Sequence, residues 1–144
     1  MVAACGLLLY YAVVIMPRAA AYRHTLLALR SEQVQTLRLH TEELKGDKLV
    51  TEERILHGEA VSAFLALLSK ATSHHSNHPR GGWSCFVDID TTTSVPHFSF
   101  IVSATENDGV QFDLSSHGLD GWHYGTLRND ALKPFIEAQF HNGQ

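Results

Sequence analysis

Hydrophobic and polar side chains alternate through the second half of the chain, a pattern typical of strands with one buried face. The period of two runs through four segments, 83–90, 97–105, 110–115 and 122–127. Short connections separate these segments, and Asp108-Gly109 between the second and the third is a strong hairpin signal. The pattern therefore predicts an antiparallel meander with one buried and one wet face.

Two earlier segments are also compatible with strands. Residues 33–41 carry Leu37 and Leu39 on one face, and residues 48–55 follow the turn at Lys45-Gly46-Asp47. The second of these segments has an alternative interpretation, because residues 51–56 could instead begin the next helix.

Helical spacing is clearest over residues 59–71. The four apolar positions Val61, Phe64, Leu65 and Leu68 follow the i, i+3, i+4, i+7 order of one helix face. A second helix is predicted at the C-terminus, after a turn at Asn129-Asp130, with Pro134 at its first position. Its apolar face is formed by Phe135, Ile136 and Phe140. We interpret both stripes as core material.

These patterns predict an α+β fold. One antiparallel sheet of four to six strands, ending in the meander, is covered by two helices. The chain has 144 residues, which suits one ordinary domain, and its composition of 44% hydrophobic and 18% charged residues is that of a globular protein.

An uninterrupted run of apolar or small residues occupies positions 2–16, before Pro17 and Arg18. Extending the run to Tyr22 brings it within the roughly 17 to 25 residues of a spanning helix. We therefore predict a membrane anchor or signal segment over residues 1–22, a juxtamembrane connector over 23–32 and the α+β domain over 33–144.

Two other interpretations of this N-terminal segment stay open. A secretory signal could be cleaved after Ala21, which would release a soluble exported domain, although no Lys or Arg precedes the apolar run. A buried core helix is the other alternative, and the lack of a polar stripe from 2 to 16 counts against it.

The side of the membrane is ambiguous. Arg18, Arg23 and Arg30 follow the apolar segment and no basic residue precedes it, so the positive-inside rule favours a single-pass protein with a cytoplasmic domain. A cleaved signal would place the same domain outside, in the periplasm or beyond.

Charge is distributed unevenly along the chain. Residues 31–144 hold eight basic and all fifteen acidic residues, a formal charge of −7, although the whole chain carries −4. An acidic domain repels phosphate backbones, so nucleic acid is not expected as a partner. The two cysteines, Cys5 and Cys85, lie in different segments, and we expect no disulfide framework.

Three histidines, His74, His75 and His78, lie within five positions of a polar stretch that leads to Cys85. Imidazoles with this spacing could hold zinc, with Asp88 as a further ligand, in a small metal-binding protein or metal-dependent hydrolase. No Cys-x-x-Cys or His-Glu-x-x-His motif accompanies them, and the surrounding residues are loop formers. We therefore expect a linker rather than a metal site, and no cofactor.

Aromatic residues concentrate in the stretch 120–125. Trp122, His123 and Tyr124 could form a surface that binds a partner, because aromatic anchors dominate recognition energies. In the alternative interpretation Trp122 and Tyr124 face the core and Gly125 forms a bulge.

Catalytic motifs are absent from the sequence: there is no Gly-x-Ser-x-Gly, no phosphate-binding glycine loop and no dinucleotide fingerprint. Asp88 and Asp90, predicted on the outward face of one strand, could act as acid and base, and Cys85 could pair with His123 if adjacent strands brought them together. The sequence favours a small membrane-tethered binding or accessory module with a protein partner over an enzyme.

Overall fold

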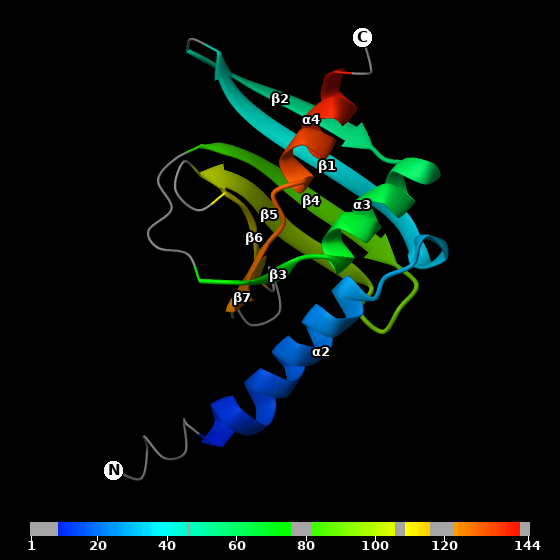
Figure 1. Cartoon of the computed structure of the whole chain (residues 1–144), viewed down its shortest axis with the longest axis vertical. Coiled ribbons are helices and arrows are strands. Elements are labelled where there is room, and N and C mark those ends of the chain that lie inside the picture. The colour runs from blue at the N-terminus through cyan, green and yellow to red at the C-terminus, as the bar shows by residue number, and fades with distance from the viewer. Residues whose placement is uncertain (1–8, 46, 76–81, 106–108, 116–122, 142–144) are drawn as a thin grey trace.

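Seven strands form one antiparallel sheet in the computed structural model (Figure 1). The structure describes residues 9–45, 47–75, 82–105, 109–115 and 123–141, without the side chains of residues 44, 45, 115, 123 and 124. The strands are β1 (Val34–Lys45), β2 (Lys48–Ile55), β3 (Thr72–His74), β4 (Trp83–Thr91), β5 (His97–Thr105), β6 (Gly109–Ser115) and β7 (His123–Arg128). Their order across the sheet is β2-β1-β4-β5-β6-β7-β3.

The predicted C-terminal meander is confirmed. Strands β4, β5, β6 and β7 pair in sequence order, each antiparallel to the next. The predicted bulge at Gly125 is present too: the β6–β7 register gains one residue on β7 between Thr126 and His123, and Gly125 has a φ of 101°. Glycine adopts this conformation without the steric cost that a Cβ imposes.

The prediction of four to six strands is wrong, because the sheet has seven. The additional strand is β3, which occupies the start of the histidine-rich stretch and pairs with β7 at the sheet edge through Thr72–Arg128, Ser73–Leu127 and His74–Thr126. Three residues are too few to show an alternating pattern, and Thr72 and Ser73 are exposed. This strand is defined by its backbone pairing with β7, which the pattern of side chains along the sequence does not reveal.

Helices lie on one face of the sheet (Figure 1). A helical run covers residues 9–27, with a π-helical part (Tyr11–Ile15) followed by α2 (Met16–Leu27). A short 3-10 turn (Ser31–Gln33), α3 (Glu59–Ser69) and α4 (Leu132–His141) complete the set. The predicted stripe of α3 is confirmed, since Val61, Phe64, Leu65 and Leu68 are all buried.

The core lies between the sheet and these helices. On the sheet, every second residue is buried from Cys85 to Thr91 in β4 and from Phe98 to Val102 in β5. One polar link fixes the start of α4 to the end of α3: the Asn129 side-chain amide donates a hydrogen bond of 2.7 Å to the Leu67 carbonyl oxygen. A covered sheet face of this kind is stabilised mainly by apolar burial.

The third helix, α2, adds to a core that was expected to have two helices. Leu26 and Leu29 are buried in the core cluster, and the Tyr22 ring packs against Phe98 with centroids 4.8 Å apart. From this packed end the helical run extends away from the sheet toward the N-terminus (Figure 1). Within the described ranges, no helix combines the length and the apolar character needed to cross a membrane; residues 1–8 of the predicted anchor lie outside those ranges.

Candidate functional site

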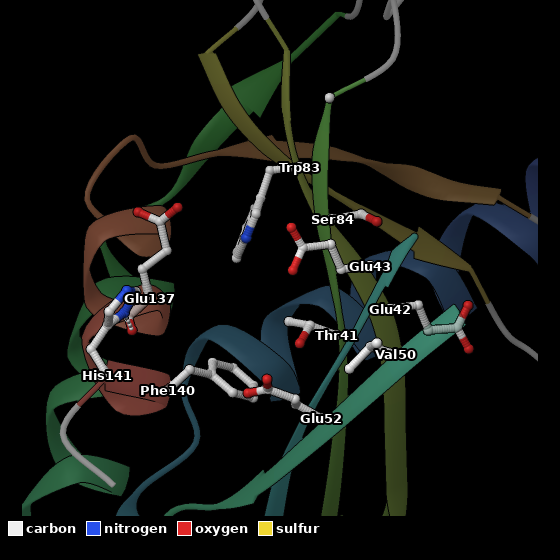
Figure 2. Close-up of a pocket in the computed structure, with 11 residues that line it drawn as sticks. Thr41, Glu42, Glu43, Val50, Glu52, Trp83, Ser84, Glu137, Phe140 and His141 are labelled. Carbon is white, nitrogen blue, oxygen red and sulfur yellow. Dashed lines mark hydrogen bonds between the residues drawn. The ribbon is translucent and has the colours of Figure 1, made fainter. Parts of the chain in front are cut away.

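A pocket of about 680 Å³ lies between α4 and the β2–β1–β4 end of the sheet (Figure 2). Cavities of roughly this size hold small ligands or side chains in many proteins. We call it the α4 pocket; its lining consists of Thr41, Glu42 and Glu43 of β1, Val50 and Glu52 of β2, Gly82, Trp83 and Ser84 at the start of β4, and Glu137, Phe140 and His141 of α4.

Strand register brings these side chains to one face. Thr41 is paired with Glu52, and Glu43 with Val50, and residues directly opposite each other in an antiparallel pair share a face. Because side chains alternate along β1, Thr41 and Glu43 lie on the same face as the buried Leu39. Glu42 lies on the other face, where its carboxylate is 3.3 Å from His40 Nε2, and it points away from the cavity in Figure 2.

The pocket occurs where the core ends but the sheet continues. Along β1 the helix-covered face changes from the fully buried Leu39 to the half-buried Thr41 and then to the exposed Glu43. The β1–β2 hairpin thus extends beyond the hydrophobic core, whereas α4 still covers this part of its face. A hollow with polar and apolar walls results.

Two aromatic rings form the apolar walls. In Figure 2 the side chains of Trp83 and Phe140 point into the space between α4 and the sheet. Gly82 permits the close approach of the strands at this point, because a Cβ there would overlap the Ala104 carbonyl oxygen. The sheet thus contributes one aromatic wall, Trp83, and α4 contributes the other, Phe140.

Two basic side chains of the protein make cation–π contacts with the rings of Trp83 and Phe140. Lys133 Nζ is 5.8 Å from the Trp83 centroid and also 2.7 Å from Glu137, and Arg54 Cζ is 5.7 Å from the Phe140 centroid. These distances are within the range in which ring faces attract cations. Of the four glutamates in the lining, Glu42 points away from the cavity and Glu137 is paired with Lys133.

The histidines singled out in the sequence do not form a described metal site. His74 ends β3 and His75 follows it as an exposed residue, whereas His78 lies outside the described residues. Asp88 cannot join His74, because three strands separate β4 from β3, a distance of about 19 Å at normal strand spacing. In the described part of the chain no group of three or more His, Cys, Asp or Glu side chains could hold a metal ion.

The predicted aromatic surface is only partly visible. Trp122 lies outside the described residues, and the backbones of His123 and Tyr124 form the start of β7 while their side chains are not described. Its role in binding a partner therefore stays a prediction.

Asp88 and Asp90 lie on the outward face, as predicted, but with partners that the sequence did not reveal. His97 bridges them, with Nδ1 2.8 Å from Asp90 and Nε2 3.5 Å from Asp88, and Arg38 lies 3.2 Å from Asp90. The register that places His97 opposite Asp90 explains the cluster. The contacts with His97 and Arg38 join the two carboxylates into one cluster on the outer face of the sheet.

The suggested pair of Cys85 and His123 is not assembled. Two strands, β5 and β6, separate β4 from β7, which places the two backbones about 14 Å apart. Cys85 is fully buried, and burial raises the pKa of its thiol to about 12. A thiol of this kind is protonated at neutral pH and is a poor nucleophile.

The sequence did not single out the residues of the α4 pocket as a site. Its walls come from segments as distant as Thr41 and His141, with no motif linking them. One signal was available: on the inward face of 33–41 and its continuation, apolar Leu39 is followed at the same phase by Thr41 and Glu43. A change from apolar to acidic side chains on one face of a strand indicates that the hydrophobic core ends there.

Comparison with known proteins gives no assignment. No family model, no curated protein and no solved structure matches this chain.

Proposed function

We propose that this protein is a small binding module that acts on a protein partner while its N-terminal helix holds it at a lipid bilayer. The observation that carries the proposal is the distribution of exposed apolar side chains. Of the eight large exposed hydrophobic residues in the described chain, five lie within residues 9–16. They are Leu9, Tyr10, Tyr11, Val13 and Met16, with exposed fractions between 46% and 67%.

Exposure on this scale is costly in water. Burying one large aliphatic side chain is worth roughly 1.5 to 3 kcal/mol, so the exposed apolar residues of 9–13, together with Met16, favour an apolar surrounding. Ile15, which lies between them, is already buried in the protein. The segment lies at the end of the helical run that extends from the domain (Figure 1). Tyr10 and Tyr11 suit the membrane–water interface, and Arg18 and Arg23 follow on the side toward the domain.

The rest of the proposal rests on the α4 pocket, which lies at the other end of the molecule from the exposed segment (Figure 1). A tether at one end leaves the pocket accessible to a partner. We favour binding over catalysis because the Cys85 thiol is buried and the pair that it was expected to form with His123 is not assembled.

Vesicle flotation tests the tether. The full chain, transferred from detergent into phosphatidylcholine–phosphatidylglycerol vesicles, is expected to float with the lipid and to resist an alkaline carbonate wash. The double variant Leu9→Lys/Val13→Lys should reduce the floating fraction more than tenfold, because each lysine costs roughly 2.5 to 3.5 kcal/mol in a bilayer-embedded helix.

The matched control places the same charges on the domain, as Leu49→Lys/Ile55→Lys, at two exposed apolar positions of β2. This variant should float as the unchanged chain does. Recovery of the unchanged chain in the lipid-free fraction, or equal flotation of both double variants, contradicts the proposal.

A further inference from the structure

We propose that the helical run binds the headgroups of anionic phospholipids through Arg18 and Arg23, at the level where its exposed apolar residues end. The inference rests on the proposed membrane tether and adds the class of lipid to it. It depends neither on the protein partner nor on the α4 pocket.

The position of Arg18 along the helix gives the first argument. Met16, the last of the five exposed apolar residues, precedes Arg18 by two positions, which is a rise of about 3 Å. The headgroup region on each side of a bilayer is roughly 5 to 7 Å thick, because the hydrocarbon core takes about 30 Å of a total of 40 to 45 Å. With the exposed side chains of residues 9–16 in the hydrocarbon, Arg18 therefore lies at the depth of the lipid phosphates.

The Arg18 side chain is available to a ligand. It is exposed, and it makes no hydrogen bond or ion pair with another residue in the part of the chain that the structure describes. A guanidinium presents a planar fork of N–H donors that can bind two phosphate oxygens at once. The first acidic residue of the chain is Glu32, so no carboxylate of the helical run competes with a phosphate for this guanidinium.

Arg23 is the second basic residue of the run, about 7.5 Å further along the helix axis. Its Nη2 donates a hydrogen bond of 2.8 Å to Ser73 Oγ of β3, which holds the side chain near the edge of the sheet. A guanidinium has five N–H donors, so this bond leaves others for a phosphate oxygen. Arg23 also lines an open hollow of about 430 Å³ on α2, in which part of a headgroup has room.

Zwitterionic lipids fit these arginines less well. Phosphatidylcholine carries a quaternary ammonium group beside its phosphate, and the arginines repel that cation. The remainder of the chain cannot supply the attraction either, because residues 31–144 have a formal charge of −7 and are repelled by an anionic surface. A preference for anionic lipid must therefore come from the helical run.

The test measures which lipid surrounds the helix when the full chain is reconstituted in vesicles. A fluorophore is attached to Met16→Cys in the Cys5→Ser chain and is quenched by lipids that carry a quencher in their acyl chains. The quencher is placed either on phosphatidylglycerol or on phosphatidylcholine, in vesicles of the same overall composition. We expect stronger quenching by the labelled phosphatidylglycerol, and a smaller difference at high salt, because the Debye length falls to about 3 Å at 1 M.

A matched pair of variants locates the site. Arg18→Gln and Arg30→Gln each remove one positive charge at an exposed position, but Arg30 follows the end of α2, which is about 17 Å along the axis from Met16. We expect Arg18→Gln to lower the relative affinity for phosphatidylglycerol about fivefold, the factor for about 1 kcal/mol per basic residue at an anionic surface. Arg23→Gln should lower it as well, and Arg30→Gln should leave it unchanged.

Two results would overturn the inference and leave the tether in place: equal quenching by the two labelled lipids, or equal losses in Arg18→Gln and Arg30→Gln. The second of these would show only a general attraction between opposite charges. Absence of quenching by either lipid would contradict the tether and the inference together, so the two failures are distinguishable.

Discussion

The two ends of one helical run have opposite surroundings. At the C-terminal end, Leu26 is 1% exposed and Tyr22 packs on Phe98, so this part belongs to the core. At the N-terminal end, Leu9 is 67% and Val13 is 64% exposed. The C-terminal end also carries Arg23, His24 and Thr25, yet its apolar residues are the ones that pack on the sheet, whereas the more apolar residues 9–13 stay exposed. The composition of a helix segment therefore does not decide what it packs against.

The largest expected effect is a loss of stability on substitution at the packed end of the helical run. Leu26→Ala should lower the free energy of unfolding of the full chain by about 2 to 5 kcal/mol, because it leaves a cavity in a close-packed core. Met16→Ala, at an exposed position of the same helix, should change it by less than about 0.5 kcal/mol. Denaturant unfolding in detergent measures both, and equal destabilisation would show that the two ends do not differ.

Alkylation of a buried cysteine tests whether the core, to which the packed end of the helical run belongs, is closed to solvent. Cys85 lies on the helix-covered face with a pKa raised to about 12 by burial. In a Cys5→Ser chain we expect iodoacetamide to leave Cys85 unmodified under native conditions at neutral pH and to modify it after unfolding. Rapid native modification, followed by mass spectrometry, would show that the core opens readily.

The smallest expected effect concerns the link between the sheet and α4. Hydrogen bonds from Arg128, and then from the Val110 backbone N–H, lower the pKa of Asp130. Stabilisation from a lowered pKa is present above the ordinary pKa of an aspartate and is lost as the pH falls through the lowered value. Asp130→Asn should therefore lower the melting temperature at neutral pH, and the difference should shrink under acid conditions.

The magnitude of this effect is small, less than about 1 kcal/mol, because the Asp130 side chain is 60% exposed. Melting curves from neutral to strongly acid pH, for both proteins, measure it. A difference that grows toward low pH would contradict the assignment.

The sequence predicted those elements whose side chains alternate or repeat. The strands of the meander, the buried stripe Val61-Phe64-Leu65-Leu68 and the outward direction of Asp88 and Asp90 are examples, because burial of one face imposes a period that can be read from the residues. The strand β3 was missed for the opposite reason, since its three residues are defined by backbone pairing with β7.

The candidate site was less predictable than the fold. Trp83 was correctly placed in a strand, and Phe140 on the apolar face of the last helix, but their meeting depends on where α4 crosses the sheet. No local spacing encodes that crossing. The bridging of Asp88 and Asp90 by His97 was likewise hidden in the register of β4 and β5.

The central claim, that the exposed end of the helical run lies in lipid, has one direct test. A polarity-sensitive fluorophore on Val13→Cys, in the Cys5→Ser chain in vesicles, should emit at a shorter wavelength than in buffer and should be quenched by lipids that carry a quencher in their acyl chains. The same fluorophore on Leu49→Cys should report water. An aqueous signal from position 13, equal to that from position 49, would contradict the claim.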